Sequence, residues 1–317
     1  MSMKRVGIVG SGIMGSGIAE VAAAAGYEVV LRSRSQASAD AMVVGLGKSL
    51  AKQVEKGKRT EEEAAQIAGR VSGTTHLGAL ADVDLVIESV VEDLDVKKAL
   101  FAELDSVCRE GAILATNTST LPVVEMAMAT GRPQLVCGIH FFNPAPAMAL
   151  VEVVRPITAA DTTVAAALEF ATACGKDPVE VKDQAGFIVN ALLFPYLNNA
   201  VRLLEGGVAT KEGIDAAMKG GCGFPMGPFA LLDLVGLDTS LAILDALYAE
   251  FRDPNYAAVP LLRRLVTSGQ LGRKTKQGFY DYQREGPAVG GGGKRAEWWE
   301  ALPPPQGGEV DEPGQQT

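Results

Sequence analysis

The sequence predicts an α/β fold in which a doubly wound sheet of parallel strands is followed by an all-α domain. Short β-branched, apolar runs alternate with helical stretches as far as residue 182, and a glycine-rich turn directly follows the first of these runs. From Gly186 onward the pattern is amphipathic-helical, with no strand signal before residue 278. Such alternation is typical of a sheet covered by helices on both faces.

The elements of the first half can be placed by their periodicity. Strands are expected at 5–9, 27–32, 85–88, 112–116, 135–141 and 150–154, and helices near 13–25, 36–68, 93–108 and 161–174. The stretch 36–70 is long for a crossover and rich in Lys and Glu. We therefore expect it to form a helical arm, a pair of helices that stands off the sheet.

The change of pattern near residues 183–186 predicts a domain boundary. We expect a sheet domain over 1–184, which includes the arm at 36–70, and a helical domain over 185–283. The remaining residues, 284–317, contain a run of four glycines, a run of three prolines and both tryptophans. This composition cannot bury enough apolar surface to order itself, so we expect a disordered tail.

Composition excludes several classes of function. The net charge of −9 disfavours nucleic acid or an anionic membrane as the main partner, although a local basic patch can still bind a phosphorylated ligand. The four cysteines form no CxxC pair, which is typical of reduced thiols in a cytoplasmic enzyme and argues against a metal site. We expect no targeting or membrane-spanning segment.

The glycine-rich turn has the context that a dinucleotide-binding motif needs. Gly10, Gly12 and Gly15 follow an expected strand and open an expected helix, with Ile13 and Met14 between the last two glycines. Gly10 permits the tight turn, Gly12 lets the backbone approach a pyrophosphate, and Gly15 lets the helix pack closely on the strand. The turn predicts a Rossmann-type site for a nicotinamide dinucleotide at the N-terminus of this helix.

The end of the second strand favours one of the two nicotinamide dinucleotides. A carboxylate at this position normally binds the adenosine ribose and repels a 2′-phosphate, but here the chain carries Ser33 followed by Arg34. A guanidinium can bind a phosphate, so the sequence favours NADP(H), with NAD(H) still possible. The alternative is that Arg34 pairs with a surface acid.

Histidine is scarce, and one of the two histidines stands in a distinctive context. His140 precedes Phe141-Phe-Asn-Pro144, and Glu152 follows twelve residues after it, across a Pro-containing turn. A carboxylate there could bind one ring nitrogen and leave the other as a general base. The alternatives are that His140 is an ordinary core residue and that Glu152 faces water.

The residues alone leave the roles of three further features undecided. Ser119 follows a strand directly and could contact a ligand, although the position favours the N-cap of a helix at 122–128. Asn190 falls mid-helix in an apolar run, which is unusual for an amide without a buried partner. Lys48, Lys52 and Lys56 share one face of the arm, either as a solvated stripe or as a site for a phosphorylated ligand.

Taken together, these motifs resemble the L-3-hydroxyacyl-CoA dehydrogenases, and within that family the bacterial 3-hydroxybutyryl-CoA dehydrogenases most closely. The match runs in order from about residue 4 to residue 282. The segments that carry it are GSGIMG at 10–15, IESVVE at 87–92, TNTS at 116–119, HFFNP at 140–144, Glu152, GFIVN at 186–190 and PMGP at 225–228.

The resemblance implies roles for the site residues. His140 would remove the hydroxyl proton as hydride leaves C3, Glu152 would orient the imidazole, and Ser119, Asn190 and Asn143 would contact the substrate. The resemblance also places Glu92, Lys97 and Asn117 near the cofactor and Ser49, Lys52 and Lys56 on coenzyme A. It further implies a homodimer formed through the helical domain.

One departure concerns the cofactor, because the family usually carries Asp where this chain has Ser33. The function expected is reversible oxidation of (S)-3-hydroxyacyl-CoA, of short chain, to 3-oxoacyl-CoA with a nicotinamide cofactor. The rival interpretations are a dehydrogenase of a hydroxyacyl carrier protein or of a free hydroxy or sugar acid, and a non-catalytic dinucleotide-binding protein.

Overall fold

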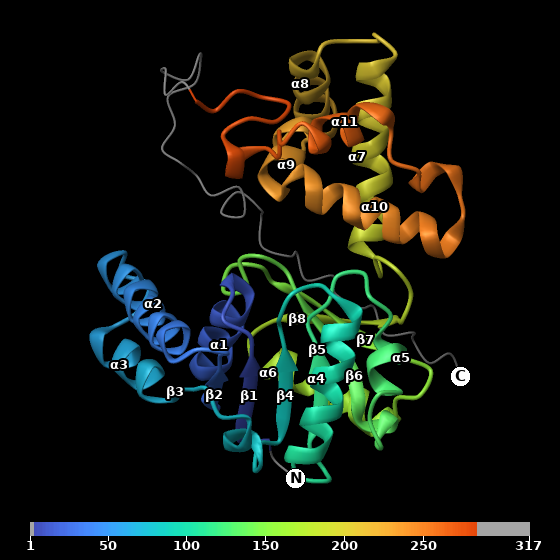
Figure 1. Ribbon diagram of the computed structural model, residues 1–317. Coiled ribbons are helices and arrows are strands. Elements are labelled where there is room, and N and C mark those ends of the chain that lie inside the picture. Colours follow the sequence, from blue (N-terminus) through green and yellow to red (C-terminus); the bar gives the residue numbers. More distant parts are fainter. Residues whose placement is uncertain (1–2, 284–317) are drawn as a thin grey trace, which may run out of the picture.

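A computed structural model describes residues 3–283 of the chain, which form a sheet domain with a helical domain above it (Figure 1). Eight strands lie in the order β3-β2-β1-β4-β5-β6-β7-β8. Their bounds are β1 Arg5–Val9, β2 Glu28–Arg32, β3 Val71–Thr74, β4 Leu85–Glu88, β5 Ile113–Thr116, β6 Val136–Phe141, β7 Leu150–Arg155 and β8 Asp177–Lys182.

The sheet is doubly wound, as predicted, and its order reverses between β1 and β4. Strands β1 to β6 are parallel throughout. In sheets of this kind ligands bind beyond the carboxyl ends of the strands, where the order reverses. Gly10 follows β1 and Ser89 follows β4 at this point, so the glycine-rich turn lies at the expected binding edge.

Two features of the sheet differ from the prediction. β7 runs antiparallel to β6 because residues 142–149 form a short loop, whereas a parallel return needs a crossover of a dozen or more residues. β3 was missed because Val-Ser-Gly-Thr is short and polar, as an edge strand can be. The strand signal at 278–282 corresponds to an isolated bridge between Gln277 and Asp281.

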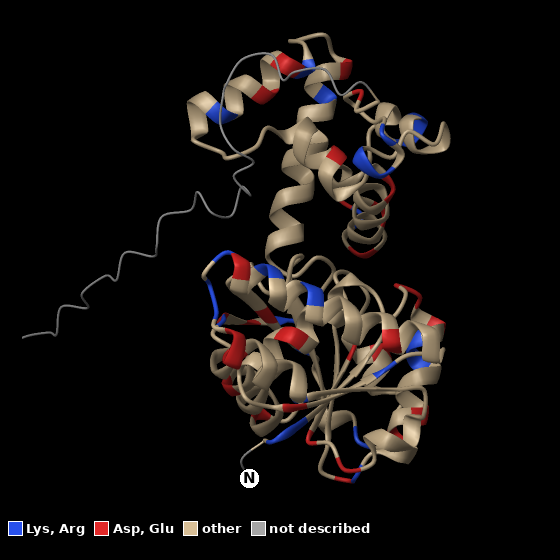
Figure 2. Ribbon diagram, turned by 90° about the vertical axis from the view of Figure 1, so that its left-hand side faces the viewer, with Lys and Arg blue, Asp and Glu red and all other residues tan. Residues whose placement is uncertain are grey.

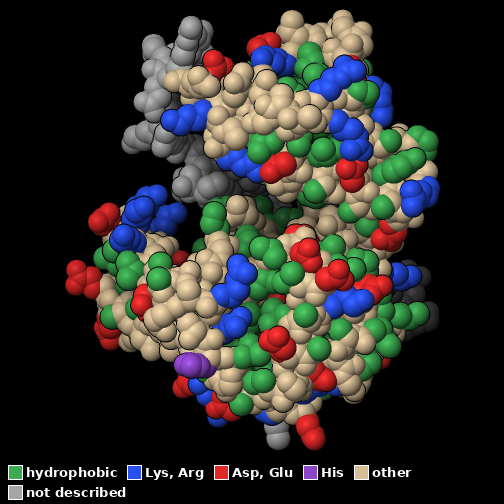
Figure 3. Space-filling view, in the orientation of Figure 1, with side chains coloured by type: hydrophobic (Ala, Val, Ile, Leu, Met, Phe, Trp, Pro, Cys, Tyr) green, Lys and Arg blue, Asp and Glu red, His purple; other side chains and the backbone are tan. Residues whose placement is uncertain are grey.

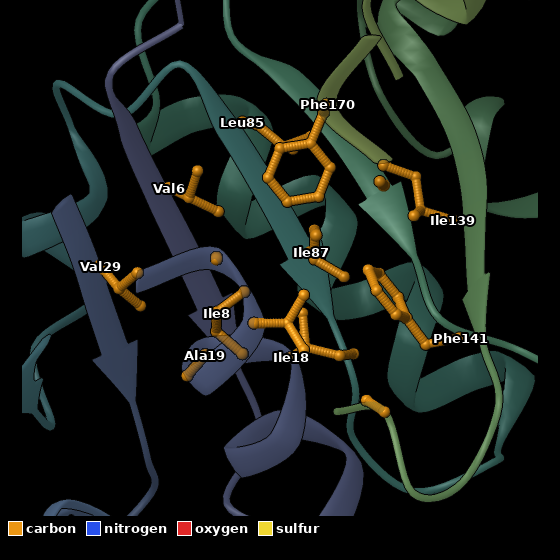
Figure 4. Close-up of a cluster of buried hydrophobic side chains, with 14 of the residues drawn as sticks. Val6, Ile8, Ile18, Ala19, Val29, Leu85, Ile87, Ile139, Phe141 and Phe170 are labelled. Atoms are coloured by element: carbon orange, nitrogen blue, oxygen red, sulfur yellow. The ribbon is translucent and has the colours of Figure 1, made fainter. Parts of the chain in front are cut away.

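Helices cover both faces of the sheet. α1 (Ile13–Ala24) and α6 (Asp161–Ala173) bury Ile18 and Phe170 in one cluster, together with Ile8 and Ile87 of the sheet (Figure 4). α4 (Leu94–Val107) and α5 (Val123–Ala127) pack in a second cluster on the opposite face. Two 3-10 turns, η1 (Leu77–Leu80) and η2 (Pro133–Leu135), complete the connections. The strands are thereby held rigidly at the binding edge.

The predicted arm consists of α2 (Gln36–Glu55) and α3 (Glu61–Gly69). The side chain of Ser35 caps α2, and Thr60 and Glu63 form a capping box at the start of α3, which fixes the turn between the two helices. Lys and Arg side chains gather at the tip of the arm (Figure 3). The arm therefore presents positive charge beside the binding edge.

The helical domain stands over the carboxyl ends of the strands, and α7 runs down to them (Figure 2). Its helices are α7 (Val189–Glu205), α8 (Lys211–Cys222), α9 (Pro228–Val235), α10 (Leu237–Phe251) and α11 (Pro260–Thr267), with the 3-10 turns η3 (Pro254–Tyr256) and η4 (Arg273–Thr275). Two buried carboxylates, Asp215 and Asp233, accept amide hydrogen bonds at Phe229 and Phe279. These bonds hold α9 and the last residues of the domain in place.

Within residues 3–283 no helix is both long enough and apolar enough to cross a bilayer. The predicted tail, 284–317, lies outside the described residues.

Candidate active site

The histidine and the glutamate singled out by the sequence lie directly opposite each other on neighbouring strands. The β6–β7 register pairs His140 with Glu152, and Nδ1 of His140 lies 2.7 Å from Oε2 of Glu152. The other ring nitrogen, Nε2, lies 3.2 Å from the Ser119 hydroxyl. His140 is 4% exposed and Glu152 is fully buried. With Nδ1–H donating to the carboxylate, Nε2 is free to accept a proton at the open side of the pair.

The second oxygen of Glu152 binds the start of the helical domain. Oε1 accepts hydrogen bonds of 3.0 Å from the amides of Ile188 and Val189, where α7 begins. These two amides fix the orientation of the carboxylate at the start of α7. Asn190, predicted to lie mid-helix, instead belongs to the first turn of α7 and is buried. The structure therefore places it one residue beyond an amide that binds the catalytic pair.

Ser119 does not cap the following helix, contrary to the interpretation that the residues alone favoured. The cap of α5 comes from Asp183, whose carboxylate accepts hydrogen bonds from the amides of Val123 and Val124. Burial raises the pKa of Asp183, and these two amide bonds oppose the rise. Because Asp183 supplies the cap, the Ser119 hydroxyl is available to face His140.

Glu92 holds the loop that carries Ser119. Its carboxylate accepts a hydrogen bond from the Ser119 amide at 3.0 Å and another from the Thr118 hydroxyl. Behind it, the Lys97 ammonium lies 3.4 Å from Glu92 and 2.7 Å from Glu88. Glu88 and Lys97 are both fully buried. Lys97 is thus held inside the protein, behind Glu92.

Glu88 was missed by the sequence analysis, although a signal existed. It ends an otherwise apolar strand, Leu-Val-Ile-Glu, nine residues before a lysine in the next helix. A carboxylate in such a strand needs a buried partner, and the ammonium provides one. Both polar atoms of the Asn117 side chain form hydrogen bonds within the protein. Its Oδ1 accepts a hydrogen bond from the Phe141 amide, and its Nδ2 donates one to the Ser89 hydroxyl.

The glycine-rich turn has the shape that a dinucleotide requires. A Cβ at Gly10 would lie 2.2 Å from the Ser89 carbonyl oxygen, and one at Gly15 would lie 2.3 Å from the Gly10 carbonyl oxygen. At Gly12 a Cβ would meet nothing within 4 Å. No side chain caps α1, so its first amides are free to bind phosphate. Ile13, which is 78% exposed, and Met14 lie beside this opening.

The end of β2 contains an unsatisfied polar atom. The Ser33 hydroxyl is buried and has no hydrogen-bond partner among the described residues. Arg34 is exposed and forms no ion pair within residues 3–283, so the surface-acid alternative has no partner there. An unpaired hydroxyl beside an unpaired guanidinium fits the adenosine end of a dinucleotide.

A hollow of about 490 Å³ lies between the glycine-rich turn, the arm and the loop after β6. Gly12, Ile13 and Ser49 contribute to its lining. Lys52 and Lys56 are exposed on α2 and at its C-terminal end, and Asn143 is exposed on the loop after β6. The hollow therefore joins the glycine-rich turn, predicted to bind the cofactor, to Ser49 of the arm, predicted to bind coenzyme A.

A sheet of this topology with a buried His–Glu pair at its binding edge defines a nicotinamide-dependent dehydrogenase. Family models agree: the 3-hydroxyacyl-CoA dehydrogenase NAD binding domain matches residues 5–184, and the 3-hydroxyacyl-CoA dehydrogenase C-terminal domain matches residues 186–282. The chain belongs to the 3-hydroxyacyl-CoA dehydrogenase family.

Individual relatives are similar over nearly their whole length. The chain is 48% identical to a 3-hydroxybutyryl-CoA dehydrogenase of Clostridioides difficile, covering 88% of this chain and 100% of the relative. It is 42% identical to the human mitochondrial hydroxyacyl-coenzyme A dehydrogenase, covering 89% and 92%. The crystal structure of (S)-3-hydroxybutyryl-CoA dehydrogenase from Ralstonia eutropha matches with a TM-score of 0.87 at 42% identity, covering 89% of this chain and 100% of that one.

Proposed function

We propose that this protein catalyses the reversible oxidation of a short-chain (S)-3-hydroxyacyl-CoA, 3-hydroxybutyryl-CoA above all, to the 3-oxoacyl-CoA. The observation that carries the proposal is the paired geometry at the binding edge, with Glu152 on one ring nitrogen of His140 and Ser119 on the other. The names of the relatives support the short acyl chain.

In the oxidation, Nε2 of His140 accepts the proton of the 3-hydroxyl group, and the same nitrogen returns it in the reduction. Glu152 stabilises the imidazolium that forms, and its fixed position keeps the proton on Nδ1. The nicotinamide dinucleotide, when bound, supplies the hydride acceptor. Ser119 and Asn190 would contact the substrate oxygens, and Asn143 would also contact the substrate.

The other site residues would bind the two nucleotide groups. We assign the dinucleotide to Gly10, Gly12, Ile13, Met14 and Gly15, and to Ser33 and Arg34 at the adenosine end. Glu92, Lys97 and Asn117 would shape the nicotinamide end, Lys97 acting through Glu92 because it is buried. Coenzyme A would bind along the arm at Ser49, Lys52 and Lys56.

We propose NADP(H) as the preferred cofactor, with NAD(H) also used. A carboxylate at residue 33 would repel a 2′-phosphate, whereas the buried Ser33 hydroxyl and the exposed Arg34 do not. In Ser33→Asp we expect kcat/KM to shift from NADPH toward NADH. Equal kcat/KM values for the two cofactors in the native protein would contradict the preference.

We also propose that residues 1–184 bind the cofactor, that residues 185–283 bind substrate and form a homodimer, and that the enzyme is cytoplasmic. Exposed apolar side chains on α7, Leu192 at 72% and Leu203 at 46%, support burial against a second copy. Light scattering on the full chain tests this, and a monomer at micromolar concentration would contradict it.

The deciding experiment is the initial rate of acetoacetyl-CoA reduction with NADPH and NADH in parallel. We expect turnover in the native protein and a loss of roughly 10²- to 10⁴-fold in His140→Ala. Replacing the exposed His76 with Ala is the matched control and should leave kcat unchanged. Wild-type kcat in His140→Ala would contradict the mechanism.

A further inference from the structure

The turn that joins the two domains contributes directly to the surroundings of the catalytic pair. Gly186 and Phe187 are consecutive residues with left-handed backbone, at φ +73° and +47°. Glycine adopts this region readily, but a bulky residue does so only where the surrounding structure imposes it. The two residues that follow supply the amides that bind Glu152, so this backbone conformation aims both donors at the carboxylate.

Phe187 is held in place by packing rather than by local preference. Its side chain is 5% exposed and belongs to the cluster beneath α4 and α5, although the residue lies at the start of the helical domain. Its ring also packs against the His140 imidazole, with centroids 5.5 Å apart at an angle of 58°. One residue therefore contacts the base through its ring and orients, through its backbone, the amides on the carboxylate that pairs with that base.

We propose that Phe187 is a positioning residue for the dehydrogenase reaction. It packs on the imidazole ring, and it places the amides of Ile188 and Val189 so that the Glu152 carboxylate is held against Nδ1. The proposal rests on the assignment of His140 as the base. A change at Phe187 should therefore alter the chemical step and leave the binding of cofactor and thioester nearly unchanged.

The charged groups around the pair are few. Glu152 on β7 binds the imidazole directly, Glu92 binds the Ser119 amide, and Asp183 binds the amides at the start of α5. Glu92 and Asp183 have no hydrogen bond to the imidazole among the described residues. A change in the turn would therefore reach the imidazole through Glu152 or through the Phe187 ring itself.

The structure offers a matched control for the ring. Phe194 is also buried, at 2% exposed, and lies seven residues further along the chain on α7, but it packs in the core of the helical domain. We compare Phe187→Leu with Phe194→Leu in the full chain, measuring kcat, KM for acetoacetyl-CoA, dinucleotide Kd and the pH profile. Both variants lose a buried ring, so both should unfold at lower temperature.

For Phe187→Leu we expect kcat to fall about ten- to hundredfold, as small misplacements of catalytic groups do, with KM and Kd within about twofold of the native values. The acid limb of its kcat/KM profile should move, while Phe194→Leu keeps the native profile and nearly native kcat. Native kcat and profile in Phe187→Leu, or equal losses of kcat in the two variants, would overturn the proposal.

A second pair of variants tests the backbone conformation of the turn. It keeps the proposal testable if Phe187→Leu does not fold. Gly186 and Gly207, at φ +73° and +69°, flank α7 at its two ends, so alanine brings similar backbone strain at each. At Gly186 a Cβ would also lie 3.0 Å from the Ala191 amide, while at Gly207 it meets nothing. Gly186→Ala should lower kcat, and Gly207→Ala should not; the reverse order would contradict the proposal.

An NMR measurement, which needs no turnover, tests the positioning role of Phe187 separately from the proposed catalytic function. The chain has only two histidines, so each imidazole gives a distinct NMR signal that His76→Gln assigns. The His140 signal should move in Phe187→Leu and Gly186→Ala and stay in place in both controls. An unmoved signal would overturn the positioning role, whereas absent turnover in the native protein would instead reject the proposed function.

Discussion

Around Gly12 the protein leaves space that none of its described residues fills. A Cβ there meets no atom within 4 Å, and the backbone angles of −81° and −179° suit alanine as well as glycine. We therefore expect Gly12→Ala to change the free energy of unfolding by less than about 1 kcal/mol, mostly through the helix cap.

The same substitution should weaken cofactor binding, because the methyl group would occupy the path by which a pyrophosphate reaches the first amides of α1. Losing a charge-assisted hydrogen bond costs about 1.5–3 kcal/mol, which corresponds to a roughly ten- to hundredfold rise in Kd. Fluorescence titration with NADPH measures this Kd. An unchanged Kd would mean that the phosphates do not pass this residue.

At the level of elements, β4 and α4 are joined by a buried charge pair that the Ser119 loop depends on. Lys97→Met leaves the Glu88 carboxylate without its cation, and breaking a fully buried pair costs about 3–5 kcal/mol. We expect this loss in urea unfolding, with a fall in kcat because Glu92 loses the contact that holds it.

The neighbouring Lys98 provides the control. Its ion pair with Glu125 is exposed, with side chains 38% and 46% accessible, so Lys98→Met should change the free energy of unfolding far less than Lys97→Met does. A double variant, Lys97→Met with Glu88→Gln, should recover part of the stability without recovering kcat. Similar stability losses for Lys97→Met and Lys98→Met would refute the role of the buried pair.

At the end of the helical domain, the ionisation of Tyr282 predicts how the stability of the protein changes at alkaline pH. Burial and the nearby Asp233 carboxylate raise the pKa of Tyr282 from 10.0 to about 12, although Arg273 opposes the rise. The unfolded chain thus releases this proton at lower pH than the folded protein does, so stability is full below pH 10 and declines toward pH 12.

Tyr282→Phe should flatten that decline, and urea unfolding between pH 8 and 11 measures the slope. Some decline should remain, because burial also raises the pKa of Tyr280, whose hydroxyl donates to Asp215. The exposed Tyr248, changed to Phe, should leave the slope as it is. An identical slope in Tyr282→Phe would contradict the assignment.

The elements also explain what the sequence could predict. Periodicity placed six of the eight strands, since buried strands read as apolar runs. It gave no bounds for β3 and β8, the strands at the two edges of the sheet. The spacing of His140 and Glu152 across a Pro-containing turn was enough to suggest the pair. The amides of Ile188 and Val189 could not be predicted, because main-chain donors have no side-chain signature.

At the scale of the whole molecule, the net charge of the chain is opposite in sign to the local charge of the arm. The chain carries a net charge of −9, which repels a polyanionic coenzyme at long range, yet Lys52 and Lys56 lie exposed on the arm, whose Ser49 lines the hollow. Attraction within roughly 10 Å at 0.1 M salt must therefore outweigh the field of the whole protein. The effects of local charge and of net charge on binding can be separated by making the same substitution at two positions.

Lys56→Glu and Lys219→Glu change the net charge equally, but Lys219 lies exposed on α8 in the helical domain. If the arm binds the coenzyme phosphates, Lys56→Glu should raise KM for acetoacetyl-CoA about three- to tenfold at low salt and less at high salt, since exposed charges contribute about 1 kcal/mol or less each. Lys219→Glu should shift KM by less than about twofold, because the net charge alone then acts. With the acetoacetyl thioester of N-acetylcysteamine, which has no phosphates, both variants should behave like the native protein. Equal effects of the two variants on the coenzyme A thioester would show that global charge governs binding and that the arm does not.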